Sequence, residues 1–216
     1  MRQSLLLALL TILLSAAELA GEWQLTFSPI AKNLDNNDNF SRDGRFLVYD
    51  TRDTLGGGIG NSTSIMKVSV TTGLENYLYL PESVTGSQAA PGLGAASWGA
   101  ATDEVAFIHG PLMSETRQLG FYSATNRKGG VVMGDGSGDI RFLDCRDVTN
   151  EITTPGAHRG GSHRHEWSAD GKRIGFTYDD HILTAYGRNI GLMLPHEKAP
   201  CGASHYSALL IPVVPA

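Results

Sequence analysis

Hydrophobic and polar residues alternate in short runs along this chain, a pattern typical of β-strands with one buried face. In the clearest run, Ile174, Phe176 and Tyr178 alternate with more polar or smaller residues. Asp170-Gly171 before this run favours a tight turn, since glycine accepts positive φ and aspartate tolerates left-handed geometry. We therefore expect an all-β fold. The expected strand segments are 23–27, 45–50, 64–70, 75–80, 98–108, 118–124, 129–133, 140–145, 148–152 and 173–178.

The order of aromatic residue, turn and strand recurs at three places. In each copy a second aromatic residue follows the first by nine positions, and an aliphatic residue stands two positions before the second. The first and last copies also share Ser, one residue and Asp-Gly after the first aromatic, whereas the middle copy has lost the Asp-Gly. The aromatic pairs are Phe40 and Tyr49, Trp98 and Phe107, and Trp167 and Phe176. Strand-rich repeats of this size predict the four-stranded blades of a β-propeller.

We assign the blade motifs to residues near 40–80, 98–133 and 163–195, within one β-propeller domain at 18–216. Three motifs predict three blades, whereas closed propellers have about four to eight. Either degenerate strands supply a fourth blade, or the propeller is partial and has open sheet edges that favour association. The apolar tail at 207–216 indicates the start of another blade.

The segments Phe40-Ser41-Arg42-Asp43-Gly44-Arg45 and Trp167-Ser168-Ala169-Asp170-Gly171-Lys172 resemble the WD40-like repeats of TolB-type β-propellers. Related blades occur in prolyl-oligopeptidase-like enzymes and in oligogalacturonate lyases. The histidine- and arginine-rich segment 159–165, together with 178–181, is similar to a TolB-like bacterial subfamily of exported proteins with no assigned function. The resemblance implies a propeller fold and envelope partners, and it covers residues 23–190 in blade-sized pieces.

The N-terminus has the features of a signal peptide over residues 1–17. Arg2 supplies a positive charge, residues 5–14 are apolar except Thr11, and small residues follow at 15–17. The apolar run is shorter than the about 20 residues that a membrane-spanning helix needs. We expect an exported protein, periplasmic or secreted, with no transmembrane span in the mature chain.

Composition narrows the possible partners. The 216 residues include 17 basic and 22 acidic ones, for a net charge of −5, and no basic block occurs. Nucleic acid is therefore not an expected partner. Cys145 and Cys201 are the only two cysteines, and in an oxidising compartment they could form a disulfide. Two thiols without a framework pattern leave that pairing open.

Six of the seven histidines lie in the last third of the chain, and they are the chemically most suggestive feature. His163 and His165 lie two apart, so a regular strand places both rings on one face, at the first and innermost strand of a blade. Such a pair could hold a divalent metal, with His158, Asp179, Asp180 or His181 completing the shell. The alternative is that these histidines donate hydrogen bonds at blade junctions.

Arg159 and Arg164 could bind an anionic sugar or a peptide carboxylate, or could simply be solvated. No Gly-x-Ser-x-Gly elbow occurs in the sequence, so no nucleophile is predicted and the catalytic residues remain unassigned. The candidate ligand-binding residues are His158, Arg159, His163, Arg164, His165, Asp180 and His181.

Two functions are consistent with these patterns. The first is a non-catalytic propeller that binds a protein, a small molecule or an oligosaccharide on its loop face. The second is a metal-dependent enzyme similar to oligogalacturonate lyases, in which channel-facing His163 and His165 hold the metal. Fold alone does not choose between them.

Overall fold

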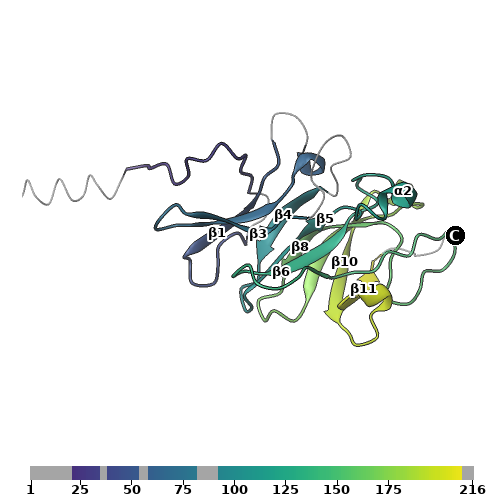
Figure 1. Ribbon diagram of the computed structural model, residues 1–216. Coiled ribbons are helices and arrows are strands. Elements are labelled where there is room, and N and C mark those ends of the chain that lie inside the picture. Colours follow the sequence, from purple (N-terminus) through teal and green to yellow (C-terminus); the bar gives the residue numbers. More distant parts are fainter. Residues whose placement is uncertain (1–20, 35–37, 54–57, 82–91, 211–216) are drawn as a thin grey trace, which may run out of the picture.

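The computed structural model describes residues 21–34, 38–53, 58–81 and 92–210, and the regular structure of these residues is mostly β (Figure 1). Their strands form three antiparallel sheets, each an up-and-down meander of neighbours in the chain. The all-β prediction is therefore confirmed, while the number of blades stays a prediction. The expected signal peptide at 1–17 lies outside the described residues. Within the described residues, no helix is long and apolar enough to cross a membrane.

The sheets follow one another along the sequence. Sheet one contains β1 (Phe46–Asp50), β2 (Ile65–Ser69) and β3 (Glu75–Tyr79). Sheet two contains β4 (Leu93–Trp98), β5 (Glu104–His109), β6 (Lys128–Met133) and β7 (Arg141–Phe142). Sheet three contains β8 (Gly161–Trp167), β9 (Ile174–Asp179), β10 (Arg188–Pro195) and β11 (His205–Leu209). The helical segments are short: η1 (Gly58–Asn61), α2 (Thr116–Leu119), η3 (Thr184–Tyr186) and η4 (Pro200–Gly202).

The three aromatic anchors occupy the same position in the three sheets. Each lies directly across an antiparallel pair from the aliphatic residue seven positions later. The pairs are Phe40 with Leu47, Trp98 with Val105, and Trp167 with Ile174. The repeat read from the sequence is therefore a real structural repeat, with β1, β5 and β9 as equivalent strands.

The Ser-x-Asp-Gly segments form the same turn at both of their occurrences. The hydroxyl of Ser168 donates to Asp170 Oδ1 at 2.6 Å, and that oxygen also accepts from the Lys172 amide at 3.1 Å. Ser41 and Asp43 repeat the hydroxyl bond at 2.8 Å. These bonds lower the pKa of Asp43 and of Asp170 to about 2, with the serine hydroxyl as the largest contributor. The motif thus encodes a hydrogen-bonded turn between the first two strands of a repeat.

In the first repeat, isolated bridges take the place of the first strand. Asn33 pairs with Asp50 and Phe40 pairs with Leu47, so Asn33 and Phe40 lie along the free edge of β1. Of the stretch between them, residues 35–37 are outside the described part. The side-chain amide of Asn39 bonds the carbonyls of Val48 and Ala96, which ties this edge to β4.

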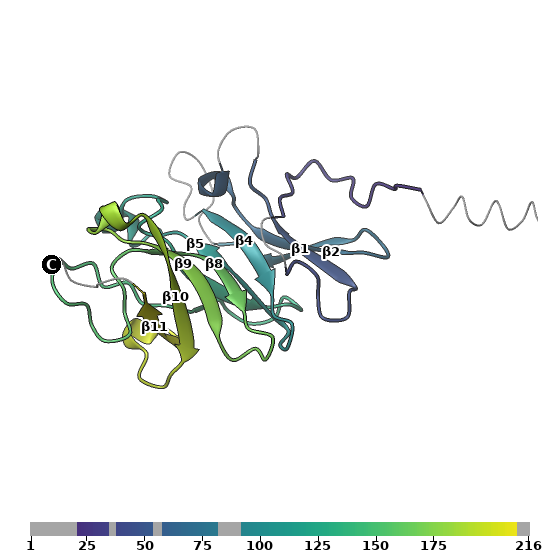
Figure 2. The same cartoon turned by 180° about the vertical axis from the view of Figure 1, so that it is seen from behind.

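The sheets pack face to face along the sequence, with β4 between β1 and β8 (Figure 2). One core cluster joins sheets one and two and includes Val48, Trp98 and Phe107. A second cluster joins sheets two and three and includes Ala106 and Phe176. Val48 and Ala106 hold equivalent positions, so each sheet turns the same face towards the next one.

The corresponding face of sheet three is uncovered within the described residues. The side chains of Ile190, Leu192 and Leu194 alternate along β10 and are 55%, 40% and 43% exposed. Their neighbours in the chain, Gly191 and Met193, point into the core shared with sheet two. Sheet three therefore ends the stack with an apolar face of the kind that a further sheet covers.

Three of the expected strands are wrong. Residues 23–27 form no strand, and Trp23 and Phe27 are 76% and 80% exposed, so no sheet buries them. Segment 118–124 falls on the end of α2 and the loop after it. Segment 148–152 is also a loop, in which Ile152 is 74% exposed. These short apolar runs have no partner strand, which local alternation cannot reveal.

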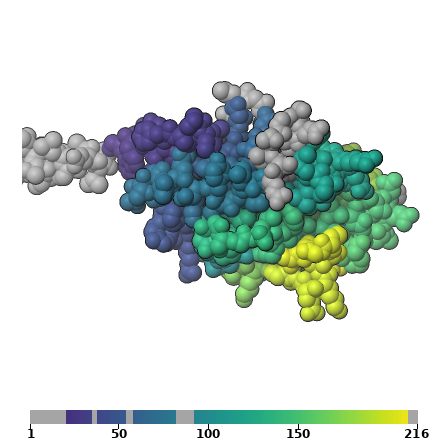
Figure 3. Space-filling view, viewed as in Figure 1, coloured from purple at the N-terminus to yellow at the C-terminus, as the bar shows by residue number. Residues whose placement is uncertain are grey.

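The expected start of a further blade at 207–216 is also wrong as far as the structure describes it. β11 is the fourth strand of sheet three, paired along β10 from Leu209 to His205. Ser204 and His205 additionally donate backbone hydrogen bonds to the carbonyls of Phe142 and Leu143, beside β7. Figure 3 shows these C-terminal residues, in yellow, lying against the green residues of sheet two.

The open face of sheet three predicts self-association. We expect the wild-type chain to form dimers or larger species as its concentration rises, because pairing buries Ile190, Leu192 and Leu194. Leu192→Lys should weaken this association by roughly tenfold or more, since it replaces buried apolar area with a charge. Sedimentation velocity measures the effect.

The matched control is Leu74→Lys, because Leu74 is 63% exposed at the turn between β2 and β3, away from this face. It should associate like the wild type. A wild-type chain that remains monomeric at every concentration contradicts the prediction.

Candidate functional site

A chain of buried polar groups connects sheets two and three. It lies in the histidine-rich region in which the sequence predicted a functional site. Asp144, just after β7, has no exposed side-chain surface. Its Oδ2 atom accepts from His158 Nε2 and from the Ser162 hydroxyl, both at 2.6 Å, and its Oδ1 accepts from the Gly129 amide at 2.7 Å. His165 Nε2 in turn lies 2.9 Å from the Ser162 hydroxyl. Asp144, His158, Ser162 and His165 therefore form one network.

Burial and the histidines set the charge of this network. Burial alone raises the pKa of the Asp144 carboxyl, but the hydrogen bond and charge of His158 hold that pKa well below its ordinary value. Burial lowers the pKa of His165 to about 4, with the nearby Asp144 carboxylate opposing the shift. Asp144 is therefore ionised and His165 neutral at pH 7.

The network has no access for a substrate. Asp144, His158, Ser162 and His165 are all at most 3% exposed. Ser162 and His158 both bond to the Asp144 carboxylate, so His158 does not lie between serine and aspartate as a catalytic base must. His165 does contact Ser162, but its Nδ1 atom has no hydrogen-bond partner among the described residues, so no carboxylate orients it. The residue types match those of a hydrolase triad, but their order and burial make them a structural link between the sheets.

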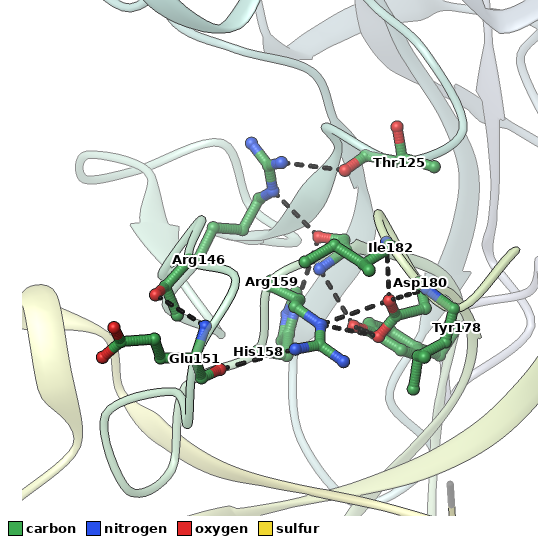
Figure 4. Close-up of polar contacts among 11 residues, drawn as sticks. Thr125, Arg146, Glu151, His158, Arg159, Tyr178, Asp180 and Ile182 are labelled. Carbon is green, nitrogen blue, oxygen red and sulfur yellow. Dashed lines mark hydrogen bonds and ion pairs between the residues drawn. The ribbon is translucent and has the colours of Figure 1, made fainter. Parts of the chain in front are cut away.

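A second buried network surrounds Asp180, and Figure 4 shows its contacts. Asp180 accepts from Arg159 Nε at 3.2 Å, from the Tyr178 hydroxyl at 2.8 Å and from the backbone amides of Ile182 and Leu183. Arg159 is 1% exposed. The predicted residues Arg159 and Asp180 thus do meet, as a buried ion pair that fixes the turn after β9.

Gly160 and Gly161 connect the two networks. The Gly160 amide donates to the Tyr178 hydroxyl at 2.9 Å, and its carbonyl accepts from Arg146 Nε at 2.8 Å. A Cβ atom at Gly160 would overlap the backbone of Asp179, and one at Gly161 would overlap the backbone of Ala124. The two glycines are needed because two backbone segments approach β8 closely from opposite sides.

The expectation that His163 and His165 share one face is wrong. The pairing of β8 with β9 shifts between His163 and Glu166, and Arg164 within this bulge has φ of 54°. His163 Nδ1 lies 3.3 Å from the Thr177 hydroxyl, whereas the His165 ring stacks on Phe176. Thr177 and Phe176 are adjacent on β9 and point to opposite faces, so the bulge separates the two rings.

The bulge is itself part of the repeat. In β4 the pairing shifts between Gly94 and Ser97, and Ala95 has φ of 52°. Ala95 and Arg164 both stand three residues before the anchoring tryptophan. Because neither residue is glycine, the sequence gives no indication that φ is positive at these two positions.

The remaining candidates lie apart from these networks. Arg164 and His181 are exposed. Asp179 forms ion pairs with Arg127 at 2.8 Å and with Arg188 at 3.1 Å. Within the described residues, no group of three or more His, Cys, Asp or Glu side chains is arranged to hold a metal ion. The described part of the chain therefore links His158 to His165 through Asp144 and Ser162, and it shows no cluster of the kind expected for a metal.

A pocket of about 410 Å³ adjoins these networks, between α2, β6, β7 and the segment after β7. Its wall includes the Cys145–Cys201 disulfide, whose Cα atoms lie 5.5 Å apart. Glu115, Lys128 and Arg146 line it, and Lys128 Nζ lies 3.9 Å from the centre of the Phe142 ring. Sequence analysis missed these residues, because they come from separate segments and belong to no motif.

A second pocket, of about 620 Å³, lies between sheets one and two. Phe46 and Trp98 stack in its wall with ring centroids 6.5 Å apart, and Lys67 Nζ lies 4.7 Å from the Phe46 ring. The cation and the rings contact one another, so the pocket's main binding groups already have partners.

Burial of the histidines predicts that stability falls in mild acid. His109 and His165 are both fully buried, and burial lowers the pKa of each from 6.5 to about 4. The unfolded chain therefore takes up protons first as the pH falls. Each histidine contributes stability that is complete above pH 6.5 and falls by roughly 3 kcal/mol on reaching pH 4.

Urea unfolding between about pH 4 and about pH 7 measures this loss. His165→Asn should show a shallower decline than the wild type, because it removes one of the buried histidines whose pKa is lowered. His181→Gln, at an exposed position, serves as the matched control and should follow the wild type. Parallel curves for all three proteins contradict the assignment.

Comparison with known proteins places the chain among relatives without an assigned activity. A family described as "Protein of unknown function (DUF3748)" matches residues 92–206, which is 115 of the 216 residues. The uncharacterized protein YidR of Escherichia coli strain K12 is 32% identical over 177 residues, which cover 80% of this chain and 39% of YidR. The chain thus spans about two fifths of the length of this curated relative.

Among solved structures, TolB from Acinetobacter baumannii is similar with 14% identity and a TM-score of 0.45, over 85% of this chain and 32% of that one. An oligogalacturonate lyase in complex with manganese is similar with 16% identity and a TM-score of 0.49, over 81% of this chain and 42% of that one. In both cases the match covers less than half of the solved chain.

Proposed function

The chain belongs to the family described as "Protein of unknown function (DUF3748)", and we propose that it is a non-catalytic binding module with the architecture of a partial, TolB-like β-propeller. Its ligand, a small molecule or a short segment of a partner, occupies the pocket between α2 and β7. Three consecutive meander sheets with equivalent aromatic anchors support the propeller architecture.

One observation carries the proposal. The histidines, serine and aspartates that resembled a catalytic set are enclosed in the Asp144 and Asp180 networks, while Glu115 and Lys128, which pair with each other, line an accessible pocket next to them. Catalysis needs an acid, a base or a nucleophile that reaches substrate, whereas binding needs only a concave surface with a few fixed polar groups. The pocket meets the second requirement.

Export is part of the same proposal. The signal-peptide pattern at residues 1–17 directs the chain out of the cytoplasm. The Cys145–Cys201 disulfide agrees with an oxidising compartment, because disulfides are rare in reducing ones. The disulfide ties η4 to the end of β7, which fixes one wall of the pocket.

Filling the pocket tests the binding proposal. Gln118 is exposed and lines the pocket, so Gln118→Trp should occupy part of it. We expect at least one member of a panel of neutral and acidic monosaccharides and N-acetylated amino acids to raise the thermal midpoint of the wild type. Gln118→Trp should lower the affinity for that compound by roughly tenfold or more, because a filled pocket excludes it.

Arg117→Trp is the matched control, because Arg117 is exposed on the same helix but does not line the pocket. It should bind like the wild type. A panel in which no compound shifts the wild-type midpoint, or equal loss in both variants, counts against the pocket as the binding site.

Metal analysis separates the proposal from the enzyme alternative. We expect purified protein to carry no stoichiometric divalent metal, because the bulge at Arg164 places His163 and His165 on opposite faces. Elemental analysis by mass spectrometry measures this. Stoichiometric metal that both His163→Ala and His165→Ala remove, with unsaturated product formed from digalacturonate, would favour the lyase-like function instead.

A further inference from the structure

The charged side chains that line the pocket between α2 and β7 differ in whether they already have hydrogen-bond or ion-pair partners. Three acidic residues are among those that line it, and internal donors engage the carboxylates of all three. Asp144 is held in its buried network, and Asp147 Oδ2 accepts from the amide and hydroxyl of Thr154, both at 2.7 Å. Glu115 accepts from the Leu112 amide at 2.7 Å and pairs with Lys128 at 3.3 Å. The acidic groups of the pocket therefore have their hydrogen-bond donors already.

Arg146 lines the same pocket with part of its guanidinium unused. Its Nε donates to the Gly160 carbonyl and its Nη2 to the Thr125 carbonyl, both at 2.8 Å (Figure 4). Its Nη1 is buried and has no hydrogen-bond partner among the described residues. Burial lowers the pKa of Arg146 below its ordinary value, while the carboxylates of Asp144 and Glu115 oppose the shift. The neutral carbonyls that hold Arg146 orient its charge without balancing it.

The charges of the two neighbouring arginines, by contrast, are balanced by carboxylates. Arg127 forms an ion pair with Asp179, and Arg159 forms one with Asp180. Neither lines the pocket. Of these three buried or half-buried guanidinium groups, only Arg146 has no carboxylate within ion-pair distance in the described part of the chain, and only Arg146 lines this pocket.

We propose that the pocket binds the carboxylate of a small organic acid, with Arg146 as its main partner and Lys128 as the second cation. The inference rests on the proposed binding function and gives it a ligand class. The Arg146 guanidinium lines the pocket without an ion-pair partner, and it suits a carboxylate because charge-assisted hydrogen bonds are stronger than neutral ones. Its Nη1 atom is covered by neighbouring groups, so a ligand oxygen reaches that N–H when these groups move apart on binding. The Phe142 ring beside Lys128 supplies an apolar wall for the body of the ligand.

Glu115 sets the affinity in this arrangement. It stands in the pocket as a negative charge, 3.3 Å from Lys128, and it therefore competes with an incoming anion. Glutamine at this position keeps an oxygen that can accept from the Leu112 amide, but it removes the charge. The substitution should improve binding, and loss of structure cannot imitate a gain of affinity.

The experiment measures the affinity of four probes by isothermal titration calorimetry at constant ionic strength. D-Glucuronate is compared with D-glucose, and N-acetylglycine with N-acetylglycinamide, so that each acid has a neutral counterpart from the same chemical source. We expect binding of one or both acids and much weaker binding of the neutral compounds. Glu115→Gln should tighten binding of the acid by roughly threefold to tenfold, as one fewer negative charge in a partly buried site predicts.

Glu197→Gln is the matched control, because it makes the same charge change at an exposed residue that does not line the pocket. It should leave the affinity unchanged. Arg146→Gln should weaken acid binding by roughly tenfold or more. Because Arg146 also links Gly160 to Thr125, its thermal midpoint is measured in parallel, and Glu115→Gln decides the case if that variant does not fold.

The outcomes separate the two proposals. Equal binding of acids and neutral counterparts, or Glu115→Gln binding acids no better than Glu197→Gln, overturns the carboxylate inference and leaves the binding pocket in place. If glucuronate alone binds, the ligand is a sugar acid, and if N-acetylglycine alone binds, it is an acylated amino acid or peptide end. Failure of all four probes overturns the inference, and the Gln118→Trp panel then decides whether the pocket binds anything.

Discussion

The packing of sheet two against sheet three depends on the buried carboxylate of Asp144. It comes from the segment after β7, and its partners His158 and Ser162 lie before and within β8. A buried carboxylate is costly unless hydrogen bonds and opposite charge compensate it, and removing one partner of such a group typically costs about 3–5 kcal/mol. Asp144 therefore constrains how the two sheets approach and where β8 can lie.

This constraint also explains why the polar residues that join sheets two and three differ from those that line the pocket. The bulge at Arg164 turns His165 towards Ser162 and leaves His163 beside Thr177, so the histidines serve two different surfaces. The polar side chains that the sequence predicted to bind a metal or a ligand instead form hydrogen bonds that hold segments of the chain together. The pocket forms next to them, where α2 and the η4 turn meet the end of β7 and the disulfide holds the wall.

Much of the fold could be read from the sequence because the repeat encodes local chemistry. The nine-residue spacing of Trp98 and Phe107 follows from a hairpin of fixed length, and the Ser-x-Asp-Gly turn contains its own hydrogen bonds. The candidate site was harder to predict. Arg159 and Asp180 were identified and do pair, but Lys128, Arg146 and Glu115 come together only through packing of distant segments.

The sequence by itself determined β1, β5 and β9, the Ser-x-Asp-Gly turns and the equivalence of the three aromatic anchors, because these depend on neighbours within about ten residues. It could not determine which face His165 takes, since a bulge at a non-glycine residue leaves no local signal. Only the tertiary structure decided that the histidines are buried links and that Arg146 keeps an N–H without a partner beside a pocket. Burial and pairing depend on contacts between segments far apart in the chain. The sequence shows which residues are present but not which of them come into contact.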